Sequence, residues 1–283
     1  MIVDAHHHVW DLTVRDQNWI GDDLKKIRRN YSVDDLAPLA AESGVYATVL
    51  VQTIAVAEET PELLALAASS DLVAAVTGWV DLTAPSVEDD LARLMTGPGG
   101  LALRGIRHPV QGEADPNWLC RDDVRRGLAA VADAGLVYEL LILPHQLLAA
   151  ERTVAAFPHA RFVLDHGAKP PIAAAQVEPW ASALRRLAAH PNVTCKLSGL
   201  VTEARWTTWT VEDLRPYVEL LLEIFGPQRL IFGSDWPVCL LAAEYAEVLG
   251  AAQQLTSGLS TAERDAVFSG TARKIYGLPE PRT

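Results

Sequence analysis

Cysteine, positive charge and long hydrophobic runs are all scarce in this sequence of 283 residues. The three cysteines, Cys120, Cys195 and Cys239, are odd in number and widely spaced. They therefore predict neither a disulfide framework nor a cysteine-type zinc site. We expect them to be buried free thiols of a cytoplasmic protein.

Basic residues are outnumbered, since 24 Lys and Arg face 36 Asp and Glu and leave a net charge of −12. This balance disfavours binding to nucleic acid or to an anionic membrane surface. No apolar run reaches the roughly 18 residues of a membrane span, and the first residues lack the pattern of a secretory signal. Nucleotide-binding signatures are also missing, because Gly97–Gly100 lacks a strand–GxGxxG–helix context and no Walker motif occurs.

Hydrophobic residues are abundant and make up 49% of the sequence. They are arranged in segments of two kinds that alternate along the chain. Short aliphatic runs bounded by turn residues predict strands buried on both faces. Between them lie longer stretches of helical periodicity, including 61–68, 87–95, 124–134 and 211–225, with Thr60 and Thr210 as predicted N-caps. The predicted strands are 2–5, 46–52, 73–80, 102–108, 137–143, 161–165, 193–197 and 230–233.

Eight strand–helix alternations in one chain of this length favour an α/β fold, a single-domain (β/α)8 TIM barrel over residues 1–283. A doubly wound parallel sheet shares the alternation and stays an alternative at this point. The segment from Trp10 to Tyr31 is long and charged. We expect it to form a lid or a contact in a homo-oligomer.

Histidine and aspartate side chains follow three of the predicted strands. His6 and His8 come after the first, His166 after the sixth and Asp235 after the eighth. Alternate residues of an extended segment face one side, so His6 and His8 can reach the same ion while His7 points away. Each residue alone has an ordinary explanation as a surface or capping group. Together, at the same end of a barrel, they predict a divalent-metal or acid–base site.

These strand ends carry recognisable motifs. The chain resembles the amidohydrolase superfamily, of the amidohydrolase-2 type, and within it the sugar-acid lactonases that include fuconolactonase-like enzymes. The resemblance runs almost from end to end and is more specific for the superfamily than for the substrate. It is carried by Asp4–His8, Leu164–Gly167 and Gly233–Pro237, and at branch level by Gly105–His108, Cys195–Gly199 and Trp209–Leu214.

The resemblance implies roles for the four strand-end residues. His6 and His8 become first-strand metal positions, His166 the sixth-strand histidine of the site, and Asp235 the group that deprotonates the attacking water. The fourth strand, 102–108, contains no Lys, Asp or Glu to bridge two ions. One divalent metal, zinc by preference, is therefore expected at His6, His8, His166 and Asp235. A metal-free reaction stays open, since some lactonases of the group work without one.

Further polar and aromatic residues near strand ends are candidates for substrate contact. Arg107 can clamp a carboxylate or polarise a carbonyl, or simply form an ion pair. Tryptophan faces can pack on a sugar ring, or be core. Lys196 is an electrophile or a salt-bridge partner. The full set of substrate-contact candidates is Trp10, Gln52, Trp79, Arg107, His108, His145 and Trp236.

The activity implied is hydrolysis of a carboxylic ester bond, the opening of a small sugar-acid lactone to the free acid. A metal-dependent decarboxylase of the same superfamily is the nearest alternative. A lactonase for a dicarboxylate or muconolactone is another, although it would need more cationic clamps than Arg107. A non-catalytic barrel that binds a sugar acid is a third, disfavoured by the four polar residues at the strand ends.

Overall fold

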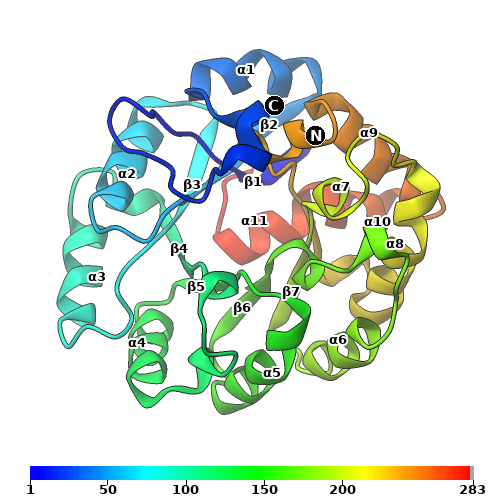
Figure 1. Cartoon of the computed structure of the whole chain (residues 1–283). Coiled ribbons are helices and arrows are strands. Elements are labelled where there is room, and N and C mark those ends of the chain that lie inside the picture. The colour runs from blue at the N-terminus through cyan, green and yellow to red at the C-terminus, as the bar shows by residue number, and fades with distance from the viewer. Residues whose placement is uncertain (281–283) are drawn as a thin grey trace.

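Eight parallel strands lie side by side in chain order and curve into a barrel (Figure 1). The strands of this computed structural model, which describes residues 1–280, are β1 Ile2–His7, β2 Val45–Val51, β3 Val73–Gly78, β4 Leu103–His108, β5 Val137–Leu140, β6 Arg161–Leu164, β7 Val193–Leu197 and β8 Leu230–Phe232. The first and last strand regions meet where Asp235 N donates to His6 O at 2.8 Å and His8 N to Trp236 O at 2.7 Å. All eight predicted strands are confirmed, and with them the barrel.

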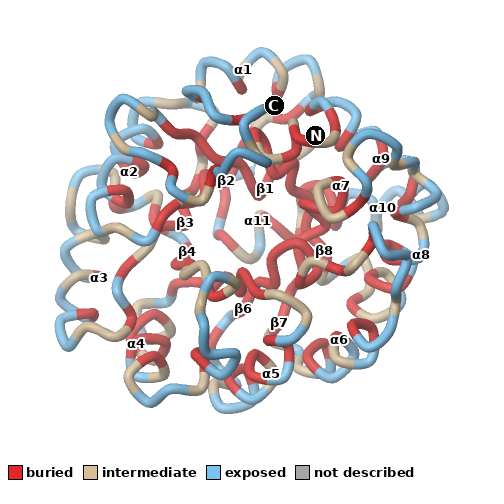
Figure 2. Tube along the Cα trace, viewed as in Figure 1, coloured by how far each residue is buried: buried red, intermediate tan, exposed pale blue. Residues whose placement is uncertain are grey.

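Helices surround the barrel, and their exposed faces lie on the outside (Figures 1 and 2). Three helices begin with a reciprocal serine or threonine cap, since Ser32, Thr210 and Ser260 each pair with the acidic residue three positions later. The helices are α1 Val33–Glu42, α2 Glu59–Ser69, α3 Val87–Thr96, α4 Asp122–Asp133, α5 Leu147–Ala156, α6 Trp180–Ala188, α7 Leu200–Glu203, α8 Val211–Phe225, α9 Tyr245–Leu255, α10 Thr261–Asp265 and α11 Thr271–Tyr276.

One predicted helix start was wrong. The helix α2 begins at Glu59, so Thr60 lies inside it and is not its N-cap. The Thr60 hydroxyl instead accepts from Trp79 N at 2.8 Å and donates to Trp79 O at 2.9 Å. The Thr60 side chain, predicted from the local sequence to cap the helix, thus makes a tertiary contact with the residue that follows β3.

The apolar core has two parts. One fills the space between the strands and the outer helices. The other fills the barrel itself with small residues such as Ala5, Ala47 and Ala75 from the early parts of the strands. The helix α11 closes that end, because Tyr276 packs in the same inner cluster. Because the N-terminal ends of the strands are closed, the barrel is open at the C-terminal ends, where barrel enzymes place their active sites.

Several smaller expectations can be compared with the structure. Cys195 and Cys239 are buried free thiols, as predicted, and Cys120 is free and half-buried. The Trp10–Tyr31 segment is closed at its base by an antiparallel bridge between those two residues. Among the helices of residues 1–280, none has the length and apolar character needed to cross a membrane.

Candidate active site

An irregularity in β1 turns two histidines into the barrel. Ala5 belongs to the apolar interior, and the register of β1 against β2 shifts around it. Such a shift lets the next residue, His6, face the interior as well. His7 faces outward and its Nε2 lies 2.9 Å from Thr48 Oγ1. The alternation predicted that His6 and His8 share a side, but only the irregularity makes that side the barrel interior.

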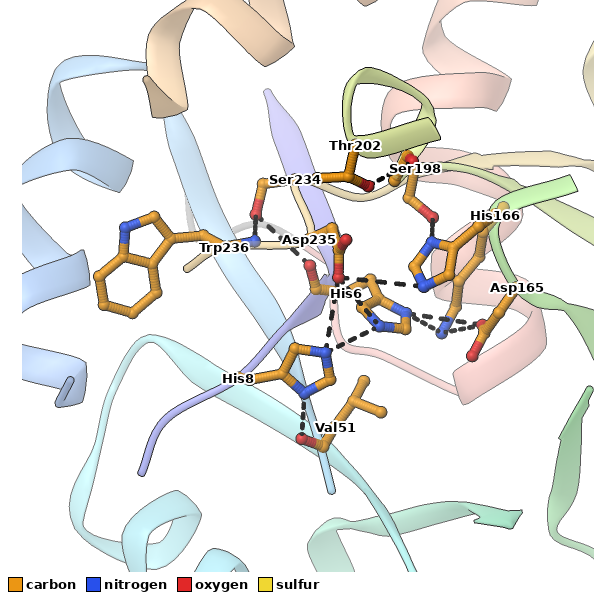
Figure 3. A network of polar contacts seen from close by, with 12 residues as sticks. His6, His8, Val51, Asp165, His166, Ser198, Thr202, Ser234, Asp235 and Trp236 are labelled. Carbon is orange, nitrogen blue, oxygen red and sulfur yellow. Dashed lines mark hydrogen bonds and ion pairs between the residues drawn. The ribbon is translucent and has the colours of Figure 1, made fainter. Parts of the chain in front are cut away.

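The four predicted strand-end residues meet at the open end of the barrel (Figure 3). His6 Nε2 lies 3.1 Å from His8 Nε2. Asp235 Oδ1 lies 3.7 Å from His6 Nε2, 3.6 Å from His8 Nε2 and 3.9 Å from His166 Nε2. All four side chains are buried. One carboxylate oxygen is thus surrounded by three imidazoles.

Two of these four residues have left-handed backbone conformations. The φ angles are 53° at His166 and 58° at Asp235. The first belongs to a run of four consecutive positive φ angles from His166 to Lys169. Non-glycine residues rarely adopt this conformation, which costs on the order of 1–3 kcal/mol and concentrates at functional sites. These turns direct the imidazole and the carboxylate toward each other.

The burial of the cluster determines its charge. Desolvation lowers the pKa of His166 to about 4, so the imidazole is neutral at neutral pH. Burial raises the pKa of Asp235, but the neighbouring His166 and His8 outweigh this and hold it below the ordinary value. Asp235 is therefore an ionised acceptor beside the neutral imidazole of His166, which is the state a general base requires.

Backbone and side-chain groups hold both β1 histidines in place. The Val51 carbonyl can only accept, so His8 Nδ1 donates to it at 2.7 Å and leaves its Nε2 as an acceptor. The Lys196 ammonium can only donate, and it lies 2.9 Å from His6 Nδ1. His6 Nε2 lies 3.1 Å from His8 Nε2 and 3.3 Å from Arg107 Nη1, which can only donate.

The donor set fits one divalent ion. Zinc ligands at about 2.0–2.2 Å in tetrahedral geometry lie roughly 3.3 Å apart, close to the separations among His6 Nε2, His8 Nε2 and Asp235 Oδ1. The proton of His8 on Nδ1 suits an Nε2 ligand. A proton on His6 Nδ1 would have Asp165 Oδ1, at 3.5 Å, as its acceptor. His166 belongs to a second group of possible ligands with His6 and Asp165.

Below the cluster lies a buried ion network. Lys196 Nζ contacts Glu139 Oε2 at 2.6 Å and Asp165 Oδ1 at 3.1 Å. Arg107 Nη1 contacts Asp165 Oδ2 at 3.1 Å. Tyr276 on α11 donates to Glu139 at 2.5 Å. Burial raises the pKa of Asp165, but Lys196 and the other cationic neighbours outweigh it and hold it well below the ordinary value.

Of the two predicted roles of Lys196, electrophile or salt-bridge partner, the structure shows the salt-bridge partner. The network also contains residues that sequence reasoning missed. Glu139 and Asp165 were not predicted as part of the site. A signal for Glu139 exists, since it is a charged residue in the apolar strand β5 and alternates inward with Val137. Nothing local distinguished Asp165 from a turn residue.

Two substrate candidates, Gln52 and Arg107, lie at the edge of the cluster. The Arg107 guanidinium donates to the Gln52 carbonyl as well as to Asp165, so much of its charge is already paired. Gln52 Nε2 donates to the Arg107 carbonyl at 3.1 Å. Gln52 Oε1 is buried and has no hydrogen-bond partner in the described residues. It is therefore an available acceptor for a hydroxyl group.

His108 and Trp79 form one unit. Trp79 Nε1 donates to His108 Nδ1 at 3.0 Å, which places the His108 proton on Nε2, 2.7 Å from Glu113 Oε1. The His108 ring stacks on Trp118 with centroids 4.2 Å apart. Both ring nitrogens are thus engaged with protein. His145 lies after β5 in a short 3-10 turn, and it is exposed.

Trp10 and Trp236 do not reach the cluster. Both are buried and pack edge-to-face on Tyr31 between them. Trp236 points away from Asp235 (Figure 3). Trp10 also lines a cavity of about 620 Å³ between the 10–31 segment and the helices α1 and α2, outside the barrel. Packing on Tyr31 accounts for the positions of both indoles, and sugar stacking on them stays a prediction.

Comparisons with known proteins agree with this geometry. The chain is 42% identical over 290 residues to the L-fucono-1,5-lactonase of Burkholderia multivorans, which covers 99% of this chain and 97% of the relative. It is 40% identical over 283 residues to that of Burkholderia ambifaria, with 99% and 96% covered. A crystal structure of an amidohydrolase from Burkholderia multivorans with bound zinc superposes with a TM-score of 0.92 at 40% identity, covering 99% of this chain and 100% of that one. The profile described as "Amidohydrolase" matches residues 3–278. The chain belongs to the amidohydrolase family.

Proposed function

We propose that this protein hydrolyses a sugar-acid lactone to the free acid, with Asp235 as the general base. The observation that carries the proposal is the buried Asp235 carboxylate, held ionised within 3.9 Å of three imidazoles at the open end of the barrel. The names of the two relatives, both L-fucono-1,5-lactonases at 40% identity or more, support the substrate class.

The reaction needs one proton acceptor, one donor and a water molecule. Asp235 takes a proton from water as the oxygen attacks the lactone carbonyl. The neutral imidazole of His166 faces the same space and stabilises the negative oxygen that develops. The ring C–O bond then breaks, its electrons stay on the ring oxygen, and that oxygen takes the proton back from Asp235. The product is the open hydroxy acid.

We propose one divalent ion at this site, zinc by preference and dispensable for the proton transfers just described. His6, His8 and Asp235 would hold it, with His166 as a further candidate ligand. When bound, zinc lowers the pKa of water and polarises a carbonyl. The bound zinc of the similar Burkholderia multivorans structure supports the choice of metal.

A neutral lactone suits the surroundings better than a dicarboxylate. Arg107 already pairs with the Asp165 carboxylate, so its charge is not free to bind a carboxylate of the substrate. The unpartnered Gln52 Oε1 is an acceptor for a sugar hydroxyl. We propose Gln52 and Arg107 as substrate contacts, with Trp79, His108 and His145 along the wall of the site.

A pH-indicator assay over a panel of aldonolactones tests the proposal. Wild type should release acid rapidly from at least one lactone, and Asp235→Asn should lower kcat by about 10²–10⁴. The matched control is Asp71→Asn, an exposed aspartate before β3, which should behave as wild type. Absence of acid release from every lactone, with and without zinc, would refute the proposal. Carbon dioxide release from an aromatic acid would then indicate the decarboxylase alternative.

A further inference from the structure

The loop that follows β7 packs directly against His166. Ser198 is buried, and its Oγ lies 2.8 Å from His166 Nδ1 (Figure 3). On the other side of the ring, His166 Nε2 lies 3.9 Å from Asp235 Oδ1. The imidazole is therefore held at one nitrogen by a hydroxyl and presents the other nitrogen to the carboxylate.

The next residue, Gly199, also fixes the ring position. A Cβ at Gly199 would lie 2.5 Å from His166 Nδ1 and 2.7 Å from its Cγ, so the backbone itself contacts the imidazole. The φ angle of Gly199 is +63°, in the left-handed region that favours glycine. The backbone thus approaches the ring more closely than any other residue type would allow.

The position of Ser198 is itself constrained. A Cβ on Gly233 would come within 3.2 Å of Ser198 Cβ, so the end of β8 packs closely on the serine. The segments that follow β6 and β7 are joined a second time by the ion pair of Lys169 Nζ with Glu203 Oε1 at 3.0 Å. These contacts oppose relaxation of the left-handed turn at His166, a conformation that persists only where the surroundings enforce it.

The direction of the Ser198 hydrogen bond follows from the other side of the ring. A neutral imidazole has one N–H and one lone pair, and a serine hydroxyl can donate or accept. If Nε2 carried the lone pair, it would face the negative Asp235 oxygen, which is repulsive. With the proton on Nε2 the interaction is attractive, and Nδ1 must then accept from the serine.

We propose that Ser198 is a positioning residue, whose hydroxyl donates to His166 Nδ1 and keeps the ring proton on Nε2, beside Asp235. The inference deepens the proposed lactone hydrolysis and rests on it for its catalytic consequence, since this N–H faces the carbonyl that water attacks. It also assigns His166 to hydrogen-bond donation and leaves the metal to His6, His8 and Asp235.

The test is ¹⁵N NMR of histidine-labelled, chelator-treated protein, in which protonated and unprotonated ring nitrogens have distinct shifts. The His166 signals are assigned by their loss in His166→Gln. Wild type should show a single tautomer with the proton on Nε2, and Ser198→Ala should show a mixture. The matched control is Thr202→Val, which removes a hydroxyl of the adjacent helix α7 that donates to Gly199 O at 2.8 Å and leaves the His166 contact intact. It should keep the wild-type pattern.

Kinetics give the second readout. Ser198→Ala should lower kcat for the best lactone about tenfold and leave KM within about twofold, because one hydrogen bond to a reacting group is lost and the substrate contacts remain. A wild-type spectrum with the proton on Nδ1 would overturn the proposal without any variant. An unchanged spectrum in Ser198→Ala would do the same. If wild type opened no lactone, the proposed function would fail while the spectrum still decided the role of Ser198.

Discussion

Replacement of Lys196 by methionine tests the buried network beneath the site. Lys196 is the cation that contacts Glu139, at 2.6 Å, and it also contacts Asp165 at 3.1 Å. All three side chains are fully buried. In Lys196→Met, Asp165 keeps its ion pair with Arg107, whereas the Glu139 carboxylate loses the lysine that it contacts.

The expected loss of stability is large. Removing one member of a buried ion pair costs about 3–5 kcal/mol, because the other charge stays desolvated and unpaired. At roughly 2 °C per kcal/mol for a chain of this size, the Tm should fall by about 6–10 °C. The double variant Lys196→Met/Glu139→Gln removes both charges and keeps the acceptor of the Tyr276 hydroxyl, so it should recover most of this loss.

Thermal unfolding followed by calorimetry, with urea unfolding at 25 °C, measures these differences. The matched control is Lys169→Met, which breaks the partly exposed pair with Glu203 and should cost no more than about 1 kcal/mol. A Tm for Lys196→Met within 2 °C of wild type would refute the reasoning. So would a double variant as unstable as the single one, because the loss would then come from packing and not from the unpaired carboxylate.

The remaining predictions concern the site and its supports. Acid protonates Asp235 only below its lowered pKa, and His166 stays neutral down to about pH 4. The kcat/KM of metal-free protein should therefore be flat from pH 7 to about pH 5, and an acid limb centred near pH 6.5 would contradict this. Zinc added to chelator-treated protein should raise Tm, and less so in Asp235→Asn. Gly199→Ala should lower kcat and cost about 1–2 kcal/mol in thermal unfolding, because its Cβ would meet the His166 ring at φ +63°. Thr210→Val should lower Tm by roughly 2 °C through loss of the α8 cap, with kcat unchanged.

Sequence reasoning reached the fold because its signals are local. Buried strands such as β7, predicted at 193–197, are short aliphatic runs bounded by turn residues, and the helix 211–225 carries both its period and its cap. The boundaries that differ are those where a tertiary contact competes with a local one. Thr60 is the clear example, since its hydroxyl bonds to Trp79 and does not cap α2.

The candidate site divides in the same way. Sequence by itself determined that His6, His8, His166 and Asp235 lie at or just after the ends of strands and so gather at one end of a barrel, because parallel strands all end on the same side. It could not determine that Trp10 and Trp236 pack on Tyr31, since an indole near a strand end suits the core and a sugar face equally.

Only the tertiary structure placed Glu139, Asp165 and Lys196 in one ion network and Ser198 against His166. These contacts join different strands and loops, and no spacing along the chain encodes them. The physical reason is that an isolated strand determines which way its side chains alternate. The curvature of the closed barrel, together with the irregularity in β1, determines which side chains from other strands they meet.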